Sequence, residues 1–99
     1  MPPAGSKKMT VKFFAYLREY TNCKIVDFPY QEDVRKLTQA LSETYGNRLR
    51  EKLLTPDGTD LGEEIIILVN GRHVEHLGGI DTKLLPTDTV SIFPVVAGG

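Results

Sequence analysis

The sequence has one cysteine and no tryptophan among its 99 residues. A single thiol, Cys23, cannot form an internal disulfide, and it cannot supply the four thiolates of an iron–sulfur cluster. A reducing, cytoplasmic environment is therefore the simplest expectation. A catalytic thiol would need a neighbouring base and an electropositive setting, and no other feature of the sequence points to either.

Long apolar runs and an excess of one charge are also missing. The net charge at pH 7 is −1, with 12 basic and 13 acidic residues mixed along the chain, so no basic surface for nucleic acid is expected. No apolar stretch approaches the roughly 18 residues that a membrane-spanning helix requires. A composition of 40% hydrophobic and 25% charged residues is typical of one globular domain. We expect no nucleic-acid or membrane partner, and a monomer when the chain is free.

Catalytic and metal-binding patterns are equally scarce. Neither the phosphate-binding pattern G-x-x-x-x-G-K-[ST] nor the dinucleotide pattern G-x-G-x-x-G occurs. The histidines of "HVEH", His73 and His76, do not match H-E-x-x-H. Zinc needs three or four ligands, and Cys23 is the only other Cys or His in the chain. We therefore expect no catalytic residues, no metal and no bound cofactor, which argues against a stand-alone enzyme.

Short β-type segments are what the sequence offers instead. Four segments rich in β-branched and aromatic residues are predicted as strands: residues 10–17, 23–28, 65–69 and 89–94. The third, "IIILV", is a continuous apolar run, which predicts burial on both faces of a sheet. Asn70-Gly71 follows it and is typical of a tight hairpin turn, with a short further strand after it. Residues 18–22 are interpreted as a turn, and residues 47–64 as an irregular connection with one helical turn.

One amphipathic helix interrupts these strands. Within residues 31–46, Val34, Leu37, Leu41 and Tyr45 recur at helical spacing and form one apolar stripe. The order strand, strand, helix, strand, strand predicts an α+β fold. It is the order of the ubiquitin-like β-grasp, with a mixed sheet of four to five strands over one main helix.

The two ends of the chain differ from the predicted domain, which we place at residues 9–94. Residues 1–8, "MPPAGSKK", have no periodicity and are predicted to be a disordered extension. Residues 95–99 are predicted to be a flexible tail, and the chain ends on Gly98-Gly99. Glycine is costly to order, and at a usage of about 7% two given positions are both glycine roughly once in 200. A frayed terminus is the simplest explanation, so the glycines alone do not establish a function.

Three longer stretches carry a family resemblance. "VKFFAYLRE", "ILVNGR" and "LLPTDTVSIFPVVAGG" resemble the ubiquitin-like β-grasp sulfur carriers, which include the molybdopterin synthase small subunits and the small archaeal modifier proteins. The resemblance covers residues 10–99. Val95 stands where the family often has a second proline. The insertion "TPDGTDLGEE" is longer than in many bacterial small subunits and looks more like the archaeal modifiers.

The resemblance implies that the carboxyl group of Gly99 is the working group. A partner adenylating enzyme of the ubiquitin-activating type would activate it with ATP, and Gly98 would leave the carbonyl uncrowded. Sulfur transfer would then give a thiocarboxylate, used with a molybdopterin synthase large subunit to build molybdopterin. Attack by a target lysine would instead give an isopeptide bond. The sequence does not separate these two fates, and a non-covalent adaptor with an inert tail is the alternative.

A docking surface is predicted beside the tail. By strand periodicity, Phe14 and Phe93 fall on the side of their strands that faces away from the core. Two exposed aromatic rings on one sheet face predict a contact patch for a partner protein. Pro94 and Val95, at the start of the tail, are assigned to the same partner-binding surface. The alternative is that the rings cover a second small core or the chain's own loops.

Overall fold

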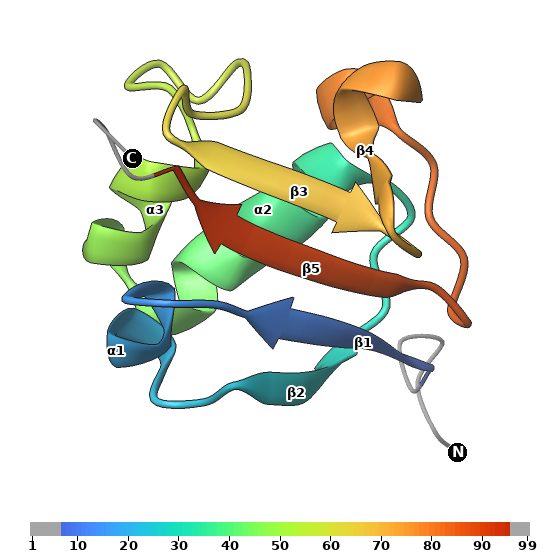
Figure 1. The fold of residues 1–99 in the computed structure, drawn as a ribbon, viewed down its shortest axis with the longest axis horizontal. Coiled ribbons are helices and arrows are strands. Elements are labelled where there is room, and N and C mark those ends of the chain that lie inside the picture. The colour runs from blue at the N-terminus through green and yellow to red at the C-terminus, as the bar shows by residue number, and fades with distance from the viewer. Residues whose placement is uncertain (1–6, 96–99) are drawn as a thin grey trace.

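A single mixed sheet organises the protein (Figure 1). The computed structural model describes residues 7–95. The sheet has five strands in the order β2-β1-β5-β3-β4, with bounds β1 Lys8–Phe13, β2 Ile25–Pro29, β3 Ile65–Val69, β4 Arg72–His73 and β5 Thr89–Pro94. The β1–β5 pair is parallel and the other pairs are antiparallel. The predicted α+β β-grasp architecture is confirmed.

Helix α2, Val34–Tyr45, packs across one face of the sheet and supplies much of the core (Figure 1). The predicted stripe is confirmed, because Val34, Leu37 and Leu41 are fully buried. The helix begins after Asp33, whose side chain accepts a hydrogen bond of 2.8 Å from the Lys36 amide. This bond satisfies one of the amide groups that the first helical turn leaves without a partner.

The sheet is buried on one face only. In β3, Ile65, Ile67 and Val69 are buried, whereas Ile66 and Leu68 are partly exposed. The prediction that this strand is buried on both faces is therefore wrong. The reason is that the described helices cover only the α2 side of the sheet, so alternate side chains of β3 face outward. We call the uncovered side the outer face.

Two short helices stand where a turn and an irregular connection were predicted. Helix α1 spans Leu17–Thr21 and helix α3 spans Asn47–Leu53. The predicted strand 10–17 ends early, at Phe13, because Ala15 takes a left-handed backbone conformation with φ of 54°. Each short helix buries its apolar residues, and two 3₁₀ turns, η2 at Val74–His76 and η3 at Gly79–Asp81, follow β4.

The pairing of β1 with β2 extends into the segment that the sequence pattern places in the N-terminal extension. Lys8 pairs with Pro29 across the β1–β2 ladder, and the Lys7 carbonyl accepts a hydrogen bond from the Tyr30 amide. Backbone pairing of this kind needs no apolar side chain, so composition does not reveal it. Residues 1–6 of the predicted extension lie outside the described part of the chain.

Candidate functional site: the outer face and the start of the tail

The two predicted aromatic residues meet on the outer face. The Phe14 and Phe93 rings are stacked, with centroids 4.0 Å apart and planes 11° from parallel. The parallel pairing of β1 with β5 brings them together, and the Phe14 amide donates a 3.1 Å hydrogen bond to the Ile92 carbonyl. The guanidinium of Arg18 lies 5.5 Å from the Phe14 ring centroid, while its Nε donates to the Phe13 carbonyl. The aromatic pair is thus held in place by the sheet and by one cation.

Two aliphatic residues that the sequence analysis did not select extend this surface. Ile66 lies directly across from Phe93, and Leu68 lies across from Ser91. Directly opposite residues of an antiparallel pair share a face, so Ile66 adjoins the aromatic stack and Leu68 continues the same face beside Ser91. Ile66 and Leu68 alternate with buried neighbours in the structure. The sequence does not show this alternation, because all residues from 65 to 69 are apolar. Phe14, Phe93, Ile66 and Leu68 form what we call the outer-face patch.

The tail begins at one end of this patch. Pro94 is the last residue of β5 and is half-buried, and Val95 is exposed. The Val95 amide donates a 2.8 Å hydrogen bond to the Glu64 carbonyl, which carries the β3–β5 ladder one residue past the strand. Gly98 and Gly99, the predicted attachment residues, lie outside the described residues.

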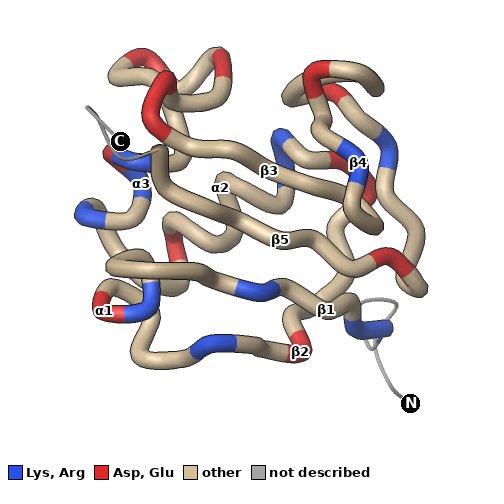
Figure 2. The backbone as a smooth tube through the Cα atoms, in the orientation of Figure 1, with Lys and Arg blue, Asp and Glu red and all other residues tan. Residues whose placement is uncertain are grey.

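Two cationic side chains of α3 pack on aromatic rings, and one of them approaches the residue that is bonded to the tail. Arg48 lies 4.6 Å from the Tyr20 ring centroid and Lys52 lies 5.6 Å from that of Tyr16. Lys52 also approaches Glu64, the residue bonded to the tail, with an Nζ–Oε1 distance of 3.9 Å. Figure 2 shows basic positions on α1 and α3. Lys52 thus places one cation, paired with Glu64, near the start of the tail.

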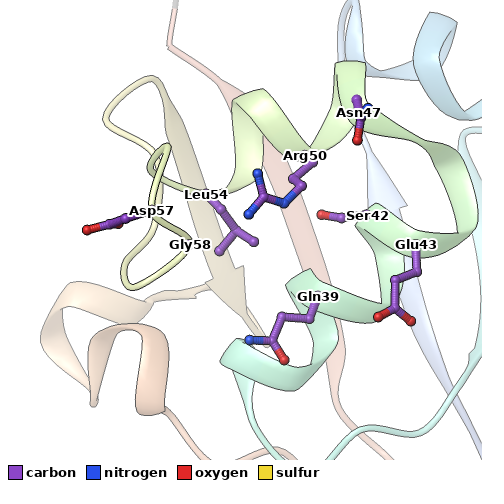
Figure 3. A pocket seen from close by; sticks show the side chains of 8 residues that line it. All are labelled: Gln39, Ser42, Glu43, Asn47, Arg50, Leu54, Asp57 and Gly58. Atoms are coloured by element: carbon purple, nitrogen blue, oxygen red, sulfur yellow. The ribbon is translucent and has the colours of Figure 1, made fainter.

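A separate cavity of about 310 Å³ lies on the helical side (Figure 3). Its lining comes from α2, α3 and the loop after α3: Gln39, Ser42, Glu43, Asn47, Arg50, Leu54, Asp57 and Gly58. None of the predicted site residues lines it. The carboxylate of Asp57 accepts hydrogen bonds from Thr55 and Thr59, which lower the pKa of Asp57. The Asp57 carboxylate therefore stabilises the conformation of the loop after α3.

Cys23 and the two histidines lie apart from the outer-face patch. The Cys23 sulfur is 3.9 Å from the Tyr45 hydroxyl, and burial together with this contact raises the pKa of Tyr45 to about 12. A phenol that stays protonated at neutral pH is no base for the thiol. His73 accepts a hydrogen bond from the Glu75 amide through Nδ1, and its ring centroid lies 5.9 Å from that of His76. Within residues 7–95, no cluster of three potential ligands includes them.

A β-grasp sheet with an open apolar face beside its last strand defines a ubiquitin-like protein, and solved structures agree. The solution structure of small archaeal modifier protein 1 from Methanosarcina acetivorans matches with a TM-score of 0.79 at 30% identity, covering 93% of this chain and 96% of that one. A chain of the Amycolatopsis orientalis BexX/CysO complex also matches with a TM-score of 0.79, at 26% identity, covering 92% of this chain and 99% of that one.

The ThiS family model matches residues 11–99, and the chain belongs to the ThiS family. Small archaeal modifier protein 3 of Haloferax volcanii is 35% identical over 94 residues, covering 93% of this chain and 99% of that protein. A proposed sulfur carrier protein of Archaeoglobus fulgidus is 46% identical over 66 residues, covering 67% of this chain and 73% of that protein. The resemblance noted in the sequence is confirmed, and the chain is a carrier or modifier protein of the sulfur-carrier and small-modifier class. In the described part of the chain, no helix has the length and apolarity needed to cross a membrane.

Proposed function

We propose that the protein acts through the carboxyl group of Gly99, which a partner enzyme adenylates with ATP. The observation that carries this proposal is the position of the tail. The chain belongs to the ThiS family. Val95, the first residue after β5, is exposed beside the outer-face patch, and only four residues follow it, the last of which carries the C-terminal carboxyl. The five residues 95–99 can span at most roughly 16–18 Å, which is enough to enter a site on another protein.

Activation is needed because a carboxylate is a poor electrophile. The α-carboxyl has a reference pKa of about 3.3–3.7, so it is ionised at neutral pH. One carboxylate oxygen attacks the α-phosphorus of ATP, pyrophosphate leaves, and an acyl adenylate forms. This chain has no phosphate-binding pattern for ATP, so the nucleotide is proposed to bind to the partner enzyme.

Two outcomes follow from the same adenylate. A persulfide sulfur attacks the Gly99 carbonyl and AMP leaves; a thiol then reduces the resulting acyl disulfide and releases the thiocarboxylate, the sulfur donor for molybdopterin synthesis with a large subunit. Alternatively, a lysine amine attacks, AMP and a proton leave, and an isopeptide bond forms. The names of the two curated relatives support one outcome each. We propose both as activities of the same tail, and the non-covalent adaptor remains the alternative.

The proposal is tested on N-terminally tagged protein expressed in its native host and purified under denaturing conditions. Intact mass would show replacement of one terminal oxygen by sulfur in a sulfur carrier. Branched peptides would identify a modifier. Because no Lys or Arg follows Lys83, trypsin leaves residues 84–99 on a modified lysine, and the search must use this long remnant. Finding neither species under several growth conditions would favour the adaptor.

The outer-face patch is proposed as the docking surface for the activating enzyme. Replacing both aromatic residues, Phe14→Ser with Phe93→Ser, is expected to weaken binding by about 1,000-fold, because truncating an aromatic residue at an interface centre often costs about 2 kcal/mol. Binding is measured by calorimetry with the purified activating enzyme. Leu85→Ser is the matched control, since Leu85 is 62% exposed and lies in the loop between η3 and β5. Normal binding by a folded double variant would contradict the docking role.

A further inference from the structure

The outermost part of the sheet has an unpaired edge. Strand β4 is two residues long and pairs with β3 only at Leu68 and Val69. On that side, Ile65–Ile67 has no neighbouring strand among the described residues. Figure 1 shows this stretch of β3 between the loop that precedes it and the turns that follow β4. An unpaired strand edge is a template for a further strand.

The backbone direction of β3 can be deduced from its bonds to β5. The Val95 amide donates to the Glu64 carbonyl, and the Asn70 amide donates to the Thr89 carbonyl. The even-numbered residues of β3 therefore direct their backbone groups toward β5. Because these groups alternate in an antiparallel ladder, Ile65 and Ile67 direct theirs toward the opposite edge. The register of β4 places Val74 opposite Ile67, and no described strand residue lies opposite Ile65.

A groove of about 420 Å³ runs beside these backbone groups. The partly exposed Leu61 and the edges of the buried Ile65, Ile67 and Val74 form an apolar lining, and Gly79 of η3 also lines the groove. One end of the groove is the loop at Gly62, whose amide donates to the Leu53 carbonyl. A Cβ atom at position 62 would lie 2.3 Å from the Lys52 carbonyl oxygen, so only glycine allows the loop to approach this closely. This wall of the groove is thus fixed by packing.

The charged residues that line the groove are acidic. Asp60 and Glu63 lie at one end and Glu75 at the other, and no Lys or Arg lines it. Figure 2 shows acidic positions on both sides of this edge of β3. His73, the only basic side chain in the lining, already uses Nδ1 to accept the Glu75 amide. The groove therefore suits a segment with an apolar centre and a cation on each side.

We propose that this groove binds an extended segment of a partner protein, apolar in the middle and flanked by Lys or Arg, as a sixth strand paired with Ile65–Ile67. Main-chain hydrogen bonds to the β3 edge would hold the segment, and the apolar lining and the carboxylates would select its side chains. A second copy of this chain fits poorly, because edge-to-edge pairing would bring the same carboxylates face to face. The interaction is non-covalent and does not involve Gly99. This proposal can therefore be tested independently of the proposed chemistry at the tail.

The test is a titration of the full ¹⁵N-labelled chain with the peptide acetyl-Gly-Lys-Val-Thr-Ile-Lys-Gly-amide at low salt. We expect amide shifts confined to β3, β4 and the two groove ends, and at least tenfold slower hydrogen exchange at the Ile65 amide. The same peptide with alternate backbone nitrogens methylated on its pairing edge is expected not to bind. Equal binding by the methylated peptide would overturn strand pairing.

Charge-reversal variants test the choice of partner. Glu63→Lys with Glu75→Lys is expected to weaken peptide binding about tenfold, since each surface ion pair contributes up to about 1 kcal/mol. Glu19→Lys with Asp27→Lys changes the net charge equally but lies on α1 and on β2, at the opposite edge of the sheet, and is expected to bind normally. Equal loss in both variants would show non-specific attraction and overturn the proposal. A peptide-free dimer whose interface includes Ile65 would do so too, by making a second copy the occupant.

Discussion

Removing Gly98 and Gly99 is expected to abolish the thiocarboxylate and every lysine conjugate, while the melting temperature stays unchanged. In the proposed function both products form at the Gly99 carbonyl, and a chain ending at Ala97 would offer the activating enzyme a carboxyl that is two residues too short and lies next to a side chain. The described sheet ladder ends at Val95, which is why no loss of stability is expected. Intact mass and the branched-peptide search measure the effect.

A chain shortened at the other end is the matched control. Deleting Pro2 and Pro3 removes the same number of residues and is expected to leave both products at normal levels. If cells that express the chain without Gly98 and Gly99 keep full activity, the tail is inert and the protein is a non-covalent adaptor. Loss of activity with retained docking to the activating enzyme would assign the defect to chemistry at the tail.

Phe13→Ala is expected to lower the free energy of unfolding by about 3–5 kcal/mol, as phenylalanine truncation in a close-packed core typically does. Phe13 is fully buried, and its ring meets the edge of the Tyr45 ring with centroids 5.8 Å apart. A domain of this size is stable by about 5–15 kcal/mol in total. The loss is therefore a large share of its stability, and urea unfolding followed by circular dichroism measures it.

The next residue along the chain is the natural comparison. Phe14 faces outward and its described aromatic partner is Phe93, so Phe14→Ala is expected to cost about 1 kcal/mol, the scale of one aromatic pair. Its effect should appear mainly in binding to the activating enzyme, whereas folded Phe13→Ala should bind normally. An equal loss of stability in the two variants would mean that Phe14 belongs to a second core instead of a docking surface.

The sequence was most informative where one pattern persists over several turns or alternations. Helix α2 was predicted because its apolar stripe repeats through 12 residues. The packed structure keeps the helix that this local pattern predicts. The orientation of Phe93 followed from the alternation in β5, where Val90 and Ile92 are fully buried. Both features depend on local periodicity, which a single sequence displays directly.

Other features depend on which segments are neighbours in space. Helices α1 and α3 have five and seven residues, too few for a periodic signal. The outward direction of Ile66 and Leu68 depends on the sheet having a helical layer on one side only. The groove beside Ile65 exists because β4 stops after two residues, and nothing in the local sequence marks that end. These parts of the docking surface and the groove require the assembled sheet.

The position of β5 determines when the sheet can be completed during synthesis of the chain. This last strand lies between β1 and β3, so the two halves of the sheet have no direct strand pairing until the end of the chain is available. During translation, the β1–β2 and β3–β4 pairs can form locally, but the sheet is completed only when β5 has left the ribosome. A truncated product therefore lacks both the central strand and the glycine terminus. Under the proposed function, completion of the fold and synthesis of the reactive end would coincide, which would keep unfinished chains out of the activating enzyme.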